Sequence, residues 1–225
     1  MVDLIKRNNV IQTDNAREPR WPALLSLVAA GGLYAALPRS LSVGPRWLLL
    51  VTMICLTIPS FALHMRAKYR SSQLLGYVTS AVVTAAMIIS LFLLVSALPA
   101  KKEEPIILLR SAMCLWFTNI IVFATWYWRL DAGGPHGRDS EVGHRAGAFL
   151  FPQMAMPSEL RQKMGNENWS PTFLDYLFLA FNTSTALSPA DTAVLSRWAK
   201  CLMMVQAIVS LTIIVLLAAR AINIL

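Results

Sequence analysis

The chain has the length of one domain, 225 residues, but 56% of them are hydrophobic and only 14% are charged, which excludes an ordinary soluble fold. The formal net charge is +8, yet the Lys and Arg residues stand between apolar runs and form no interleaved basic face, so nucleic acid is not an expected partner. Cys55, Cys114 and Cys201 lie in three different apolar runs, which indicates neither a disulfide nor a metal motif.

A polar tail, residues 1–20, precedes four apolar runs, and we expect residues 21–128 to form a region of four transmembrane helices. No Asp or Glu occurs between Glu18 and Glu103, which is expected of segments in lipid. The four predicted helices are Trp21–Leu37, Trp47–Leu63, Ser72–Leu98 and Ile106–Trp128.

Small and hydroxyl-bearing residues recur at helical spacing in the third and fourth runs. Gly76, Ser80 and Thr84 repeat every four residues, so one face of the third helix is predicted to be a packing seam. Hydroxyls recur every seven residues in the fourth helix, where we expect hydrogen bonds back to that helix or to a neighbour. These hydroxyls belong to Ser111, Thr118 and Thr125.

The one long polar segment is 129–169, and it opens with a glycine-rich stretch that we expect to be flexible. Its apolar part, Ala146–Met156, is expected to lie along the membrane surface. Several potential metal ligands are close in sequence, but their spacing matches no metal motif, so neither a metal nor a cofactor is predicted. These ligands are His136, Asp139, Glu141 and His144.

Residues 170–225 form the part of the chain around which the function is predicted. Ser170 is expected to cap a short apolar helix, with Pro171 at its first position. Pro189 should end that helix at about Ser188, and a long apolar helix is predicted from Ser196 to Ile222. A helix that stops inside a membrane and turns back requires its freed backbone groups to be buried in protein or to face water.

This order of elements resembles the pore loop and inner helix of two-helix potassium-type channels. If Asp191 is set on the Asp that follows the family's T-V-G-Y-G filter, the filter positions are occupied here by Ala-Leu-Ser-Pro-Ala. Both glycines are missing, so potassium selectivity is not expected. The resemblance implies a pore helix carrying Asp175 and a candidate pore segment. The candidates are Thr183, Ser184, Thr185, Ala186, Leu187, Ser188, Pro189 and Asp191.

The last helix carries polar residues on one arc, and two interpretations of them stay open. They could face an aqueous path, or they could form hydrogen bonds between helices while the terminal arginine extends to the headgroups. These residues are Gln206, Ser210 and Arg220, with Asn223 at the margin.

The sequence therefore predicts an all-α, polytopic membrane protein of five transmembrane helices and a short re-entrant pore-type helix. As a channel-like protein it would form a homo-oligomeric ring, most simply a tetramer, that conducts an inorganic cation. The whole chain also resembles uncharacterised bacterial integral membrane proteins, which implies the cytoplasmic membrane. Positive charge places the N-terminus inside, whereas the channel resemblance requires the reverse.

Two other function classes were weighed. A small-solute transporter or a non-conducting subunit of a membrane complex would use the same hairpin to bind a solute or a partner, although no inverted repeat is visible. An intramembrane hydrolase would use Ser184 or Ser188 with His136 or His144 and an Asp. It is disfavoured because both histidines lie in a flexible glycine-rich stretch and no Gly-x-Ser-Gly pattern is present near the serines, so we do not predict an enzyme.

Overall fold

The computed structural model describes residues 21–42, 44–45, 47–65, 69–100, 104–140, 147–165, 169–189 and 191–222. These residues are mostly helical, as predicted. The first part of the chain contains α2 (Trp21–Ala35), η1 (Arg39–Leu41), α3 (Leu48–Met65), α4 (Tyr69–Ala100) and α5 (Pro105–Leu130). The second part contains η2 (Asp131–Gly133), α6 (Gly134–Ser140), β1 (Phe149–Leu150), α7 (Pro152–Ala155), α8 (Ser158–Lys163), α9 (Phe173–Thr185), β2 (Ala193–Val194) and α10 (Arg197–Ile222).

By length and composition, three helices of the described residues could cross a membrane. Their apolar spans are Arg70–Ala97, Pro105–Arg138 and Arg197–Ala219. Two further helices are apolar: α2 has 15 residues and rises only about 22 Å against about 30 Å of hydrocarbon, whereas α3 has 18 residues and rises about 27 Å. The four predicted spans are therefore helices, and the last two of them have the full length required.

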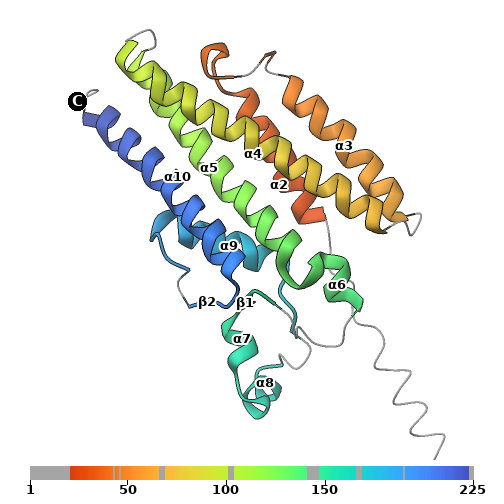
Figure 1. Ribbon diagram of the computed structural model, residues 1–225. Coiled ribbons are helices and arrows are strands. Elements are labelled where there is room, and N and C mark those ends of the chain that lie inside the picture. Colours follow the sequence, from red (N-terminus) through yellow and green to blue (C-terminus); the bar gives the residue numbers. More distant parts are fainter. Residues whose placement is uncertain are drawn as a thin grey trace, which may run out of the picture.

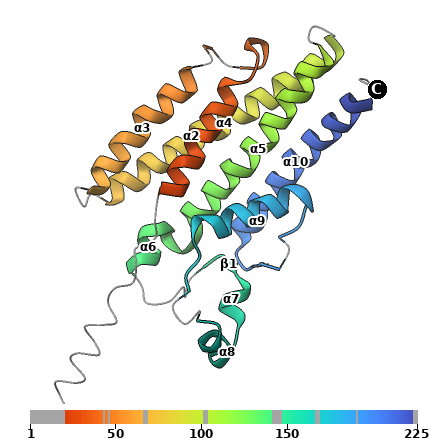
Figure 2. The ribbon, with the colours of Figure 1, turned by 180° about the vertical axis from the view of Figure 1, so that it is seen from behind.

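Helix α5 is the central element of the bundle (Figure 1). It contacts α2, α4, α9 and α10, whereas α3 packs on α2 and α4 at the edge. The long helices alternate in direction, with α6, α7, α8 and the two short strands gathered at one end (Figures 1 and 2). The last turns of α4 and α10 and the first turn of α5 lie at the other end.

The predicted seam of the third helix packs on α5. Gly76 is buried, and a Cβ atom there would lie 1.8 Å from Nη1 of Arg129, so only glycine leaves room for this guanidinium. Two turns further on, Thr84 Oγ1 accepts a hydrogen bond of 2.9 Å from Nε1 of Trp126. The seam thus joins α4 to α5 through both close packing and a polar contact.

The hydroxyls of α5 bond back to their own helix, as expected. The side-chain oxygens of Ser111, Thr118 and Thr125 donate to the carbonyls four residues earlier at 2.7, 2.8 and 2.8 Å. This arrangement pairs each hydroxyl without help from another helix.

Large apolar side chains cover the outer faces of the long helices. Phe92 on α4 is 68% exposed and Ile208 on α10 is 65% exposed. A soluble protein rarely exposes contiguous apolar surface on this scale, whereas lipid requires it. Further examples are Leu25, Val28, Ile88, Ile89, Met113, Phe117, Met204, Leu211 and Val215.

The polar segment 129–169 contains short ordered elements, and the predicted position of its apolar part along the membrane surface is wrong for three of its residues. Ala148, Phe149 and Phe151 are buried in the protein core. Strand β1 pairs antiparallel with β2, Phe149 opposite Val194, and Leu195 N donates to Ala148 O at 2.8 Å. Phe149 packs on Tyr127, Tyr176 and Trp198, and Phe151 packs on Trp169 and Tyr176, so these side chains are buried within the protein.

Candidate functional site

The N-terminal end of α9 is closed by a capping box. Thr172 is the N-cap, and the backbone N–H and hydroxyl of Thr172 donate to Oδ2 of Asp175 at 2.7 and 2.9 Å. The prediction that Ser170 caps this helix is therefore wrong, because the Thr172–Asp175 pair satisfies the free backbone donors two residues further on. Asp175, predicted as a pore-helix residue, is part of this cap in the structure.

A buried carboxylate fixes the same end of α9 to α5 and β1. Asp131, at the end of α5, is fully buried, and its carboxylate accepts hydrogen bonds from Tyr176 Oη at 2.6 Å and from the Ala148 backbone N–H. Nη1 of Arg138 donates to the carbonyls of Trp128 and Asp131 at 2.9 and 3.0 Å, and its guanidinium lies 5.1 Å from the Tyr176 ring centre. Sequence reasoning missed Asp131 because it adjoins a stretch of glycines that predicts flexibility.

The C-terminal end of α9 lies three residues before the predicted one. The helix ends at Thr185, and the N–H of Ala186 donates to Asn182 O at 2.8 Å. Leu187 then has φ of 54°, the left-handed conformation that commonly stops a helix. Pro189 therefore follows a helix that has already ended, so its effect on Ser188 does not set the boundary.

Gln206 of α10 joins this end of α9 to α5. Its Nε2 donates to Ala180 O at 2.7 Å and to Ser184 Oγ at 2.8 Å, while its Oε1 accepts a hydrogen bond from the hydroxyl of Tyr127. Ser184 Oγ also accepts from Asn119 Nδ2 at 3.3 Å. Gln206, Ser184 and Asn119 are fully buried, so three helices are linked by neutral polar groups that water does not reach.

Ser210 satisfies a backbone carbonyl that the end of α9 leaves free. Its hydroxyl donates to Ser184 O at 2.6 Å and accepts from Trp116 Nε1 at 3.2 Å. The last four carbonyls of a helix lack intrahelical partners, and an unpaired carbonyl in an apolar environment costs several kcal/mol. Gln206 and Ser210 were both singled out from the sequence, and in the structure both make hydrogen bonds between helices.

A hollow of about 540 Å³ lies between the segment after α9 and the N-terminal half of α10. From α10 it is lined by side chains three and four residues apart, which share one face of the helix. The complete lining is Thr183, Leu187, Ser188, Pro189, Asp191, Thr192, Ala193, Val194, Lys200, Met203, Met204 and Ala207. Five of the eight predicted pore candidates therefore line one hollow. Lys200, which was not predicted as a site residue, lines it with them.

Three of the eight predicted pore candidates do not line the hollow. Ser184 is buried in the network with Gln206, while Thr185 and Ala186 are exposed and do not line the hollow. The side chain of Arg220 and the whole of Asn223 lie outside the described residues.

The hydrolase and metal alternatives involve residues at another place in the fold. His136 lines a separate pocket among α2 to α6, whereas Ser188 lines the hollow beside α10. Glu141 and His144 lie outside the described residues, and within the described ranges no group of three or more His, Cys, Asp or Glu side chains is placed to hold a metal ion.

Comparison of the chain with protein-family models, with curated proteins and with solved structures finds no match.

Proposed function

We propose that the chain is an integral membrane protein in which α9, the segment after it and α10 form one subunit's share of an ion-conduction path. The three long apolar helices meet the length that an integral membrane protein requires. In this proposal α9 is re-entrant, and a closed ring of subunits surrounds the path, most simply four.

The depth at which α9 ends carries the proposal. Ser184 is hydrogen-bonded to Ser210, the fourteenth of the 26 residues of α10, and to Asn119, the fifteenth of the 26 residues of α5. If α5 and α10 cross a bilayer, α9 ends about halfway through its hydrocarbon. Helix α9 has 13 residues and rises about 20 Å, which is too short for a full crossing.

The chain returns after α9 to the end of the bundle where α9 begins. Strand β2, which precedes α10, pairs with β1, and β1 follows the end of α5 that holds Tyr176 through Asp131. Irregular backbone at membrane depth is tolerated only where protein or an aqueous cavity surrounds it. The hydrogen bonds of Gln206 and Ser210 to α9, and the hollow beside α10, support this condition for the chain after α9.

The proposal assigns a role to one charged residue of the hollow, Asp191. Asp191 is exposed at its edge, and in a ring of subunits the copies of Asp191 would attract cations. We expect Asp191→Asn to lower cation flux into vesicles several-fold at low ionic strength, and less at high ionic strength because salt screens exposed charges. The control Glu159→Gln removes an exposed carboxylate on α8, outside the hollow, and should leave the flux unchanged.

The oligomeric state is measured on the same preparations by light scattering in detergent. A ring that conducts, with a lower flux for Asp191→Asn alone, supports the proposal. Equal flux for Asp191→Asn and the wild type would reject the role of Asp191. A wild-type protein that is monomeric and passes no ions would reject the conduction path altogether.

One observation favours the alternative, a non-conducting subunit or a small-solute transporter. Lys200 lines the same hollow as Asp191, and a positive charge there reduces the attraction for cations. Under this alternative the hollow binds a solute or a partner, and Lys200→Gln would change that binding without producing flux.

A further inference from the structure

The hollow beside α10 contains two opposite charges that do not neutralise each other. Asp191 and Lys200 both line it and are exposed, and within the described part of the chain neither side chain forms an ion pair or a hydrogen bond. Asp191 belongs to the segment after α9 and Lys200 to the first turn of α10, the two elements that border the hollow. A ligand that carries both charges would complement this pair, whereas a simple cation would also meet the ammonium of Lys200.

A buried hydroxyl of the same hollow also lacks a partner. The side chain of Thr192 is only 8% exposed, yet its hydroxyl forms no hydrogen bond with the other residues that the structure describes. The hydroxyl of Thr183, by contrast, donates to Leu179 O at 2.8 Å. Because buried polar groups are normally paired, the hydroxyl of Thr192 indicates that the hollow holds a polar ligand group or water.

Apolar side chains form most of the remaining wall. Met203 and Met204 follow Lys200 by three and four residues on α10, and Ala207 lies one turn further along the same face. Leu187 contributes from the segment after α9. Ligand pockets commonly enclose about 300 to 1,000 Å³ and combine mostly apolar walls with a few polar groups. The hollow, at about 540 Å³, has both properties.

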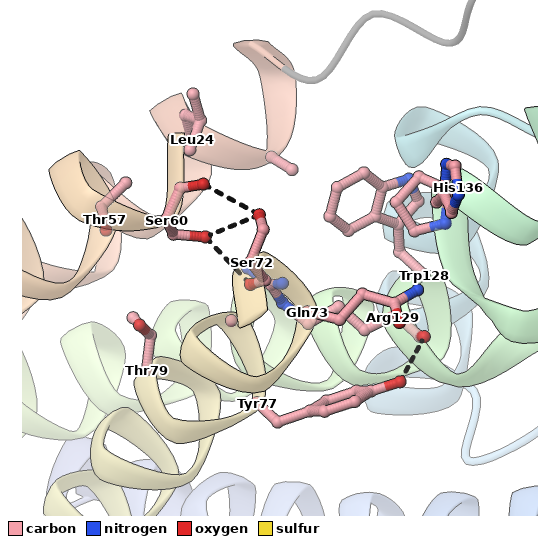
Figure 3. A pocket seen from close by; sticks show the side chains of 13 residues that line it. Leu24, Thr57, Ser60, Ser72, Gln73, Tyr77, Thr79, Trp128, Arg129 and His136 are labelled. Atoms are coloured by element: carbon pink, nitrogen blue, oxygen red, sulfur yellow. Dashed lines mark hydrogen bonds between the residues drawn. The ribbon is translucent and has the colours of Figure 1, made fainter. Parts of the chain in front are cut away.

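The pocket among α2 to α6 provides a contrast (Figure 3). It holds only about 80 Å³, and several of its polar side chains already donate to backbone carbonyls. Ser72 Oγ donates to Ser60 O at 2.8 Å, and Tyr77 Oη donates to Arg129 O at 3.3 Å. These groups hold helices together, whereas the charged groups and the Thr192 hydroxyl of the hollow beside α10 are available to a ligand.

We propose that the hollow binds a small zwitterionic solute, a free amino acid with an apolar side chain. Asp191 accepts hydrogen bonds from its ammonium group, Lys200 donates to its carboxylate, and the methionines of α10 cover its side chain. This inference rests on the second candidate function, in which the hollow binds a solute, and it names the class of that solute. It requires neither a ring of subunits nor ion conduction, because every group that it uses belongs to one chain.

The test measures thermal unfolding of the full chain in neutral detergent with leucine, N-acetylleucine or leucinamide at equal concentration and ionic strength. At about pH 6, below the ordinary pKa of an α-amino group, leucine carries both charges, N-acetylleucine only the carboxylate and leucinamide only the ammonium. A ligand that binds only the folded protein raises the unfolding temperature. We expect leucine to bind several-fold more tightly than either analogue, because each analogue loses one charge-assisted contact.

Two variants assign the charges, and both change exposed side chains, so we expect both to fold. In Asp191→Asn leucine should lose its advantage over N-acetylleucine, and in Lys200→Gln it should lose its advantage over leucinamide. The controls Glu159→Gln and Lys163→Gln remove exposed charges on α8, outside the hollow, and should keep the wild-type order of affinities.

The proposal would be overturned if leucine does not stabilise the wild type, or if leucine and both analogues stabilise it equally. Equal losses in the variants of the hollow and in the α8 controls would also overturn it. A wild type that binds leucine in this pattern but passes no ions supports this inference while rejecting the conduction path. Ion flux without leucine binding does the reverse.

Discussion

The two ends of α9 are held by side chains from other elements, but by different chemistry. At the N-terminal end the acceptor is a carboxylate, Asp131, with the guanidinium of Arg138 beside it. At the C-terminal end every described partner is neutral, an amide or a hydroxyl. Charged groups are costly at membrane depth and are tolerated near its edge. The difference is therefore the one expected of a helix that starts at the boundary of a bilayer and ends within it.

If the proposed conduction path exists, stability and conduction depend on different residues. Gln206 and Ser210 are used in hydrogen bonds between helices, so the groups that hold the end of α9 are not available to line a path. The hollow is lined instead by the segment after α9 and by a different face of α10. Changes in the network should alter stability, and changes in the hollow should alter function.

We expect the largest loss of stability from replacing Asp131, the charged partner of the N-terminal end of α9. Asp131→Leu leaves the Tyr176 hydroxyl and the Ala148 N–H without an acceptor in a buried site. We expect a loss of about 3 kcal/mol in the free energy of unfolding, measured by denaturant titration in detergent. Asp175→Ala removes only the capping box at the same end and should cost about 1 kcal/mol. Equal costs would show that Asp131 does not anchor this end.

At the C-terminal end of α9, where the partners are neutral, we expect a smaller loss of stability. Gln206→Leu leaves Tyr127 without its acceptor and Ala180 O without a side-chain donor, and we expect it to lower the free energy of unfolding by about 2 kcal/mol. The control Met204→Leu changes an exposed apolar side chain two residues earlier on α10 and should change stability little. Equal stabilities of the two variants would contradict the network.

We expect the smallest loss of stability from removing a single hydrogen bond, the one to Ser184 O. Ser210→Ala removes the donor to Ser184 O, and hydrogen bonds between membrane helices contribute about 0.6 to 1.7 kcal/mol. Thr212→Val removes a hydroxyl on the same helix that bonds only to Ile208 O in the described contacts, at 2.8 Å. We expect the first variant to be less stable by about 1 kcal/mol and the second to match the wild type in the same titration.

Much of the fold follows from local sequence patterns. The predicted bounds of the second, third and fourth spans and of the last helix lie within three residues of the observed ones, because apolar length and flanking polar residues are local signals. The seam at Gly76 and the self-bonded hydroxyls of α5 follow from helical spacing for the same reason. The expected cap at Ser170 failed because a capping box with reciprocal bonds competes with a single hydroxyl.

The partners of the candidate site could not be predicted from the sequence in this way. Asn119 meets Ser184 from 65 positions away, and Trp116 meets Ser210 from 94. Each of these residues is a polar or aromatic side chain in an apolar run, where spacing gives its helix face but not its partner. Asp131 was missed for a related reason, since its partner Tyr176 is 45 positions away on another helix.

The side of the membrane that each end of α9 faces tests the re-entrant path most directly. In a background without Cys55, Cys114 and Cys201, single cysteines replace Ser158 on α8, before α9, and Arg197, the first residue of α10. Both positions are exposed, and a membrane-impermeant maleimide is applied to one face of sealed vesicles.

A third variant, Glu104→Cys, serves as the reference because Glu104 precedes α5 and marks the other end of the bundle. If the chain enters the bilayer as α9 and returns to the same face, Ser158→Cys and Arg197→Cys are labelled from one face of the vesicles. Glu104→Cys is then labelled from the opposite face. Labelling of Arg197→Cys from the same face as Glu104→Cys, with Ser158→Cys on the other, would mean that α9 crosses the bilayer and would contradict the account.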